Sequence, residues 1–377
     1  MRADAACSHD SNRLITETKM PLDLPIPGPT DDSPANGLRA RWQELKAAQP
    51  RLRARDAAEA LGVSEAELVA AQCGITARPL KMDIEKLFAG LPALGRVMAL
   101  TRNEHCVHER KGVYEPASFG PMAGIVLGPD IDLRIFPKHW VHLFAVSDGS
   151  VEPARQSLQV YDSHGMAVHK IFALDATDMT AWAKLVEDLM PGASSVALQV
   201  TPAAPSTPRQ DVAADRDALL ADWAALKDVH EFHGMLKKHG VEALQAMQMV
   251  NGIYSEPLAI TSTNDLLMLA SERQVPIMIF VGNAGLIQIH TGLVSRIVRM
   301  DCWVNVLDPD FNLHLREDRI AYAFAVTKPT SDGALHSVEL FDAEGGRIAT
   351  LFGKRKPGEP ELETWRRIVA DLPRLTA

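Results

Sequence analysis

The sequence has little of what marks secreted, membrane-spanning or nucleic-acid-binding proteins. Only four of its 377 residues are cysteines, they form no Cys-x-x-Cys pair, and no run of about 18 apolar residues occurs. Acidic residues outnumber lysine and arginine by 48 to 39, which gives a net charge of −9, and no basic stripe is visible. We therefore expect a cytoplasmic protein with free thiols that is not inserted into a membrane and binds no nucleic acid.

The remaining composition is that of a globular protein with two domains. Hydrophobic residues make up 46% of the chain and charged residues 23%, and 377 residues exceed what one ordinary core accommodates. Residues 1–37 are rich in proline, aspartate, serine and glycine, which predicts a disordered N-terminal tail. Residues 201–215 have the composition of a linker. This linker separates an N-terminal half, residues 38–200, from a C-terminal half, residues 216–377.

The two halves repeat one pattern at an offset of 180 residues. Asn103 meets Asn283, and the segment 157–162 (SLQVYD) matches 337–342 (SVELFD) along its length. Such a constant offset indicates an internal duplication. Short apolar or alternating runs between turn signals predict strands, preceded by helices and closed by a helix in each half. The expected fold is α+β, a tandem repeat in which each half is a large, mostly antiparallel sheet flanked by helices. A ligand cleft is expected between the halves.

Residues 219–239 read as one amphipathic helix with two histidines on its apolar side. On a helical wheel, His230 and His233 fall within the arc that contains Trp223 and Leu226. A buried imidazole needs hydrogen-bond partners or a metal ion. A single histidine in such a place is most often a core residue with satisfied nitrogens. Two of them leave both interpretations open.

The two halves differ at three polar positions that suggest a function present in only one copy. These pairs are His230 and Gln49 (at the offset of 181 that aligns the tryptophans), Arg134 and His314, and Lys328 and Asp148. Alternation along 131–135 puts Arg134 on the opposite face from its apolar neighbours. Taken alone, Arg134 fits a solvated face and Lys328 a surface loop start. Together with His230, they indicate one asymmetric site.

Several motifs resemble those of a known family. They are Asp228-Val-His-Glu-Phe-His233, Thr101-Arg-Asn-Glu104, Val107-His-Glu109, Asp132-Leu-Arg-Ile-Phe136, Phe280-Val-Gly-Asn283 and Thr327-Lys-Pro-Thr-Ser-Asp-Gly333. These motifs, and their order along the chain, are similar to those of the cytoplasmic haem-utilisation proteins of Gram-negative bacteria. Members of that family are called hemin-degrading factors or hemin transport proteins, of the HemS, ChuS and PhuS type. The resemblance covers residues 38–375. It implies two repeats with haem b (iron protoporphyrin IX) in the cleft between them.

The same resemblance implies roles for five residues. His230 would be the axial ligand of the haem iron, and His233 an alternative ligand, as in the PhuS-like branch. Arg134 would reach over the opposite face of the haem, Lys328 would approach a propionate or that distal side, and Phe232 stands where the family has an aromatic. A guanidinium can hydrogen-bond a ligand of the iron without coordinating the metal itself. Arg134 would be catalytic only if haem is degraded.

Three functions are compared. We favour a haem-binding protein, monomeric or dimeric, that accepts haem from an inner-membrane haem importer and delivers it to a haem oxygenase. The alternative is an enzyme that opens the porphyrin and releases iron. The third is a zinc protein that uses His230, His233 and either His239 or Glu231. For haem, three further arginines are candidates at the rim: Arg296, Arg299 and Arg319.

Overall fold

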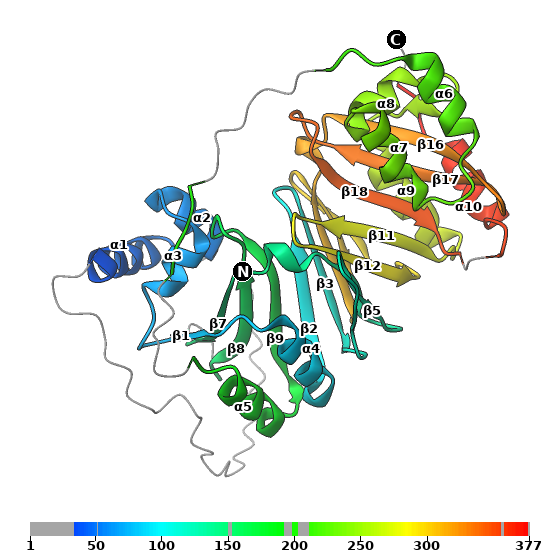
Figure 1. Cartoon of the computed structure of the whole chain (residues 1–377). Helices are drawn as coiled ribbons and strands as arrows, with labels where there is room; N and C mark the ends of the chain where they lie inside the picture. The colour runs from blue at the N-terminus through cyan, green and yellow to red at the C-terminus, as the bar shows by residue number, and fades with distance from the viewer. Residues whose placement is uncertain are drawn as a thin grey trace, which may run out of the picture.

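The computed structural model describes residues 34–50, 52–149, 153–191, 198–202, 211–355 and 358–375. Residues 1–33 of the predicted tail and residues 203–210 of the predicted linker therefore lie outside the described residues. The first helix begins at Pro34, four residues before the predicted start of the N-terminal half. Two nine-stranded sheets, in which every pairing between the named strands is antiparallel, confirm the α+β fold class (Figure 1).

The order of elements is nearly the same in both halves. The N-terminal half contains α1 (Pro34–Ala48), α2 (Ala54–Leu61), α3 (Glu65–Ala70), β1 (Ala77–Leu80), α4 (Ile84–Gly90), β2 (Gly95–Arg102), β3 (Cys106–Val113), β4 (Ser118–Phe119), β5 (Gly124–Leu127), β6 (Asp132–Ile135), β7 (His142–Asp148), β8 (Arg155–Tyr161), β9 (Ala167–Thr177) and α5 (Met179–Asp188). The C-terminal half contains α6 (Arg216–Ala224), α7 (Glu231–His239), α8 (Ala243–Met249), β10 (Ser255–Pro257), α9 (Ser262–Glu272), β11 (Ile277–Gly282), β12 (Leu286–Gly292), β13 (Ile297–Met300), β14 (Trp303–Leu307), β15 (Phe311–Arg316), β16 (Tyr322–Thr330), β17 (Gly333–Phe341), β18 (Arg347–Gly353) and α10 (Glu363–Asp371).

Each sheet is completed by three strands of the other half. The first sheet has the order β1-β7-β8-β9-β2-β3-β15-β14-β13, and the second has the order β10-β16-β17-β18-β11-β12-β6-β5-β4. At the two junctions Val107 lies opposite His314 and Ile287 lies opposite Arg134. The sequence did not predict this exchange, because alternation shows which residues form a strand and not which strand becomes its partner.

Helices cover the two faces of the second sheet unequally. On one face α9 and α10 pack against β11, where Leu266, Trp365 and Ile279 are fully buried. On the opposite face α6–α8 share a core with β16 and β17, which includes Trp223 and Phe324. Figure 1 shows α6–α8 gathered beside β16 and β18, while β11 and β12 lie nearer the middle of the molecule. The second sheet therefore keeps part of one face free of helices.

A buried polar network joins the sheets where β2 meets β12. Thr101 Oγ1 donates to Gln288 Oε1 (2.6 Å) and lies 2.9 Å from His169 Nδ1, while Tyr114 OH lies 2.6 Å from His169 Nε2. The neutral Nδ1–H tautomer of His169 satisfies both of its contacts. Burial lowers the pKa of His169 to about 3. The centre of the molecule therefore holds a neutral imidazole.

Two further histidines are buried near this network around Phe311. The ring of His290 stacks on Phe311 with centroids 3.8 Å apart, and His108 lies 5.0 Å from the same ring. Among the described residues, no hydrogen-bond partner reaches either ring nitrogen of these two histidines. Burial lowers the pKa of His290 to about 3 and that of His108 well below its usual value. Their neutral forms are therefore the ones that fit this core.

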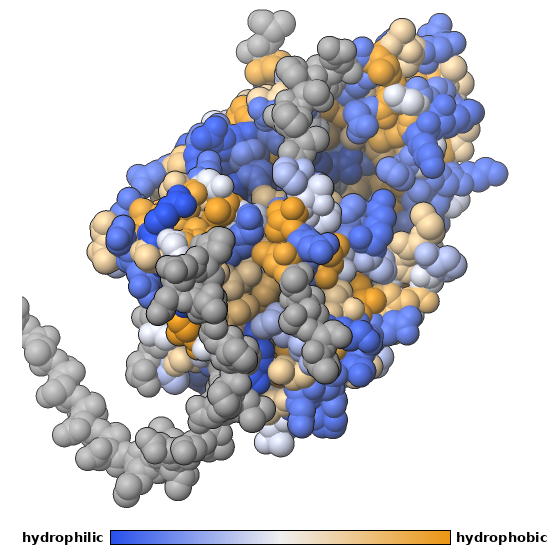
Figure 2. All heavy atoms as spheres, turned by 60° about the vertical axis from the view of Figure 1, so that its left-hand side comes forward, coloured by the Kyte–Doolittle hydropathy of each residue, from blue (hydrophilic) through white to orange (hydrophobic). Residues whose placement is uncertain are grey.

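The outer surface mixes residue types. Figure 2 shows hydrophobic residues scattered among hydrophilic ones on the side turned forward there. None of the helices in the described part of the chain is both long and apolar enough to span a membrane.

Candidate functional site

The predicted helix over 219–239 is in fact two helices separated by a turn. Helix α6 ends at Ala224 and α7 begins at Glu231, whose carboxylate accepts the backbone N–H of Lys227 at 2.9 Å. His230 immediately precedes α7, and its side chain is 85% exposed. His233 is also exposed. The prediction that both histidines lie on the buried side is wrong, because the turn resets the helical phase on which the wheel depended.

The exposed ring of His230 is held by Asp228. The backbone N–H of His230 donates to Asp228 Oδ1 at 2.8 Å, and the Nδ1 atom lies 2.5 Å from the same oxygen. The backbone bond is the main reason why the pKa of Asp228 is lowered, so this carboxylate stays ionised. A carboxylate that accepts Nδ1–H selects the tautomer whose Nε2 carries a free lone pair. The ring of His230 is thus oriented through Nδ1, and in its neutral form the exposed side chain has Nε2 available as a ligand.

The turn before α7 is attached to the end of the β16–β17 hairpin. The backbone N–H of Ser331 donates to the carbonyl of Lys227 at 3.0 Å, and Trp223 Nε1 donates to the carbonyl of Thr327 at 2.9 Å. The first contact ties the turn, and the second ties α6, to the second sheet. His230 therefore has a fixed place beside this hairpin.

Lys328 lies inside β16 and is buried, and not at the surface loop start that its sequence context indicates. Its Nζ is 2.5 Å from Glu339 Oε1 and 4.4 Å from the centroid of Phe232 in α7. Arg347 Nη2 approaches the other oxygen of Glu339 at 3.0 Å. Burial lowers the pKa of Lys328, although Glu339 opposes this effect. Two cations thus share one buried carboxylate beneath α7.

An apolar strip continues from Lys328 across the helix-free part of the second sheet. Residues directly paired in an antiparallel ladder lie on the same face. This register places Lys328, Phe352, Phe280, Ile287 and Arg134 on one face. The rings of Phe352 and Phe280 have centroids 5.5 Å apart, and all three apolar side chains are partly exposed.

Arg134 lies at the far end of this strip, three strands from Phe352, or about 14 Å at the usual spacing of strands. Its guanidinium is half-buried and forms an ion pair with Asp132 on the same strand. Burial raises the pKa of Asp132, while Arg134 opposes the shift. We call the surface formed by Phe352, Phe280, Ile287 and Arg134 the open face. It unites strands of both halves.

The structure thus brings the five residues predicted from the sequence to one side of the second sheet. Phe232 and Lys328 are in contact, His230 and His233 are exposed at the start of α7, and Arg134 closes the open face. Sequence reasoning missed the roles of Asp228 and Glu339, and it quoted Phe280 only within a motif. The alternation of polar and apolar residues on β17 was the only signal available for Glu339.

The other candidates lie elsewhere. Arg299 is on β13 at the edge of the first sheet and forms an ion pair with Glu317; Arg296 precedes that strand, and Arg319 follows β15. They lie with the first sheet and not on the open face, so their place at the rim stays a prediction. The zinc interpretation gains no support, since His239 Nε2 bonds to Asp222 at 2.7 Å. Within the described ranges, no group of three or more potential ligands could hold a metal ion.

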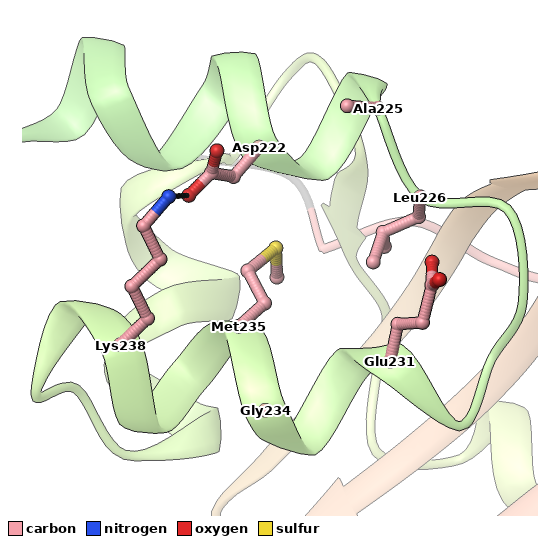
Figure 3. Close-up of a pocket in the computed structure, with 7 residues that line it drawn as sticks. All are labelled: Asp222, Ala225, Leu226, Glu231, Gly234, Met235 and Lys238. Carbon is pink, nitrogen blue, oxygen red and sulfur yellow. Dashed lines mark hydrogen bonds and ion pairs between the residues drawn. The ribbon is translucent and has the colours of Figure 1, made fainter.

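A small pocket of about 210 Å³ lies between α6 and α7. Its lining residues are Asp222, Ala225, Leu226, Glu231, Gly234, Met235 and Lys238. Figure 3 shows Lys238 of α7 reaching across to Asp222 of α6, where Nζ lies 2.5 Å from Oδ2. This pocket contains neither His230 nor Arg134, and it is separate from the open face.

Comparison with known proteins gives the family. The model of the haemin-degrading HemS.ChuX domain matches residues 62–189 and, a second time, residues 240–372. The chain belongs to this family. The hemin transport protein HmuS of Yersinia pestis is 38% identical over 338 residues, which cover 89% of this chain and 97% of that protein.

Two solved structures have the same fold. Holo-PhuS, a heme-binding protein from Pseudomonas aeruginosa, is 47% identical with a TM-score of 0.87, covering 91% of this chain and 100% of that one. The heme degrading enzyme ChuS of Escherichia coli O157:H7 is 35% identical with a TM-score of 0.85, covering 90% of this chain and 99% of that one. The family thus includes proteins named for transport, for binding and for degradation.

Proposed function

We propose that this protein binds haem b between the N-terminal end of α7 and the open face of the second sheet. The observation that carries the proposal is the exposed His230 ring, which Asp228 holds by its Nδ1 atom. A neutral imidazole with a free Nε2 is a common axial ligand of haem iron. Relatives named as heme-binding and hemin transport proteins support the same conclusion.

The surroundings of His230 fit the other parts of such a ligand. Phe352, Phe280 and Ile287 offer a partly exposed apolar surface for the macrocycle. Haem propionates are anionic, and Arg134 supplies positive charge at one end of this surface, while the buried Lys328, paired with Glu339, lies beyond the other end. When bound, haem would supply the iron that His230 coordinates. Phe232, on the buried side of α7, has its ring centroid 4.4 Å from Lys328 Nζ.

We further propose that the bound haem is carried and handed on in the cytoplasm. His233, three residues after His230 and also exposed, offers a second imidazole to which iron can pass during release. The donor would be an inner-membrane haem importer and the acceptor a haem oxygenase. Degradation is the second candidate, and the observation that favours it is the place of Arg134 at the far end of the open face, from which it would reach bound haem.

A hemin titration followed by absorption tests the binding proposal. The native protein is expected to give a Soret band typical of ligated haem at one equivalent, and His230→Ala to weaken binding and shift the band. His164→Ala, which alters a histidine bonded to the backbone of Thr201, serves as the matched control and should behave like the native protein. Identical spectra and affinities for His230→Ala and the native protein would refute the assignment.

A second experiment separates carriage from degradation. The haem complex is incubated with reductant and oxygen in the presence of catalase, and separately with a haem oxygenase. Carriage predicts a stable Soret band in the first case and transfer in the second, with transfer reduced by His233→Ala. Loss of the Soret band with a linear tetrapyrrole product, despite catalase, would favour degradation and should then depend on Arg134.

A further inference from the structure

The first sheet carries a copy of the open face. At the offset of 180, the residues that correspond to Phe352, Phe280, Ile287 and Arg134 are Phe172, Leu100, Val107 and His314. Register again places them together, since Leu100 is opposite Lys170, two residues before Phe172, and Val107 is opposite His314. The duplication therefore produced two potential ligand surfaces.

The helices beside the two surfaces align through their ends. Gly62 and Gly240 both end a helix in the left-handed conformation, with φ of 68° and 64°, which matches α2 with α7 at an offset of 178. The match continues to Gly74 and Gly252, each of which precedes an edge strand. In this alignment Leu52 corresponds to His230, so the pairing of His230 with Gln49 is wrong. Arg55 likewise corresponds to His233.

The copy in the first sheet is bridged by ion pairs. Glu65, at the start of α3, is 4% exposed and forms ion pairs with Arg102 and with Lys170, whose Nζ is 2.9 Å away. Lys170 lies opposite Leu100 and Arg102 lies opposite Val107, so these pairs cross the strip where a ligand would lie. Arg55 of α2 adds an ion pair with Glu104. We call these five residues the lock.

The four corresponding positions of the second half carry no charge that could repeat these ion pairs. Glu65, Arg102, Lys170 and Glu104 correspond to Ala243, Gly282, Thr350 and Ala284. At Gly282 a Cβ atom would lie 2.9 Å from both Ile287 Cγ1 and the Leu286 carbonyl oxygen, so a longer side chain is not accommodated. These four charged residues are thus replaced by alanine, glycine and threonine, and Arg55 by His233. The helices of the second half cannot be tied to the open face from these positions.

We propose that the lock closes the first half's copy of the ligand surface, and that Ala243, Gly282, Ala284 and Thr350 leave the second one free for a single porphyrin. This inference rests on the proposed haem binding. Two cations on one buried carboxylate hold α3 to the sheet, and a porphyrin would have to break both contacts to enter. Because Leu52 replaces the histidine, the closed copy also lacks an iron ligand.

The test moves the site from one half to the other. In a His230→Ala background, Leu52→His alone restores the ligand and keeps the lock. Leu52→His with Glu65→Ala, Arg102→Gly and Lys170→Thr also removes the two ion pairs of Glu65 that cross the strip, which makes it the unlocked variant. We expect hemin binding with an imidazole-ligated Soret band only in the unlocked variant, with at least a tenfold difference in affinity. Circular dichroism checks the fold, and Leu52→His with Glu65→Gln is the milder variant should the triple change unfold the half.

The outcomes separate the two proposals. No hemin binding by the native protein would sink the haem proposal. Binding of two equivalents by the native protein would leave that proposal standing and overturn the lock. Equal hemin affinity of Leu52→His with and without the lock would overturn it as well.

Discussion

The ammonium group of Lys328 and the carboxylate of Glu339 meet at 2.5 Å inside the second sheet, directly below α7. Both side chains are almost fully buried. Replacing Glu339 by leucine leaves the lysine without its charge partner, which is expected to lower the free energy of unfolding by about 3–5 kcal/mol. Urea unfolding measures this change.

The double variant Lys328→Met with Glu339→Leu removes both charges and should recover most of that loss, because an apolar pair of similar volume replaces a buried ion pair at little cost. Glu363→Leu, in an exposed ion pair of α10, is the matched control and should change stability by less than about 1 kcal/mol. Equal losses in the single and double variants would contradict this account.

Asp228 is expected to set the hemin affinity without touching the ligand. Asp228→Ala frees the His230 ring from the carboxylate that selects its tautomer, and loss of such a partner typically weakens metal binding about 10–100-fold. Hemin titration gives the affinity. Asp217→Ala changes an exposed aspartate on α6 and should leave it unchanged. An unaltered hemin affinity in Asp228→Ala would show that His230 does not need the Asp228 carboxylate to bind the iron.

The two sheets offer a matched pair of phenylalanines. Phe352→Ala removes part of the proposed contact with the macrocycle, worth about 1.5–3 kcal/mol for a buried ring, and should weaken hemin binding about 10–100-fold. Phe172→Ala makes the same change at the corresponding position of the first sheet and should leave the affinity unchanged. Loss of affinity in both variants would indicate that both sheets contribute to binding.

Acid should destabilise the protein through its buried histidines. The pKa of His169 and of His290 is about 3 in the folded chain, against about 6.5 when unfolded. A depressed folded pKa means that unfolding takes up protons. The free energy of unfolding is therefore highest above pH 6.5 and falls as the pH drops toward 3. At pH 5 each of the two should have cost about 2 kcal/mol of stability.

Urea unfolding at pH 7 and pH 5 measures this dependence. His290→Phe should reduce the difference between the two pH values, because the ring can still stack on Phe311 without titrating. His233→Phe changes an exposed histidine and serves as the control. A pH dependence that is the same in His290→Phe and in the native chain would exclude His290 as a source.

The sequence was sufficient for the fold class, because periodicity and the repeat depend on local patterns. It also singled out Arg134, Lys328 and His230, since residues that differ between duplicated halves stand out against a shared core. It misjudged the burial of His230 and Lys328 for two different reasons. The turn between α6 and α7 includes a contact from the backbone N–H of Lys227 to the Glu231 carboxylate, four residues along the chain, which a helical wheel does not represent. The burial of Lys328 depends on a partner eleven residues away in the next strand.

The pairing of β6 with β12 was beyond reach of sequence reasoning. The contacts that place Arg134 opposite Ile287 join residues more than 150 positions apart, and no turn geometry fixes which strands meet over such a distance. Only this pairing puts Arg134 on the same surface as Phe280. The candidate site could therefore be assigned residue by residue from the sequence but not assembled.

The exchange of three strands has a consequence for how the chain holds together. Cutting the backbone between residues 202 and 211 would free no domain, because β4–β6 would remain hydrogen-bonded to β12 and β13–β15 to β3. Either half made alone would end in a bare sheet edge, open to pairing with another chain. The two halves are thus held together by shared sheets, and the surface that carries Arg134 exists only while both halves remain paired.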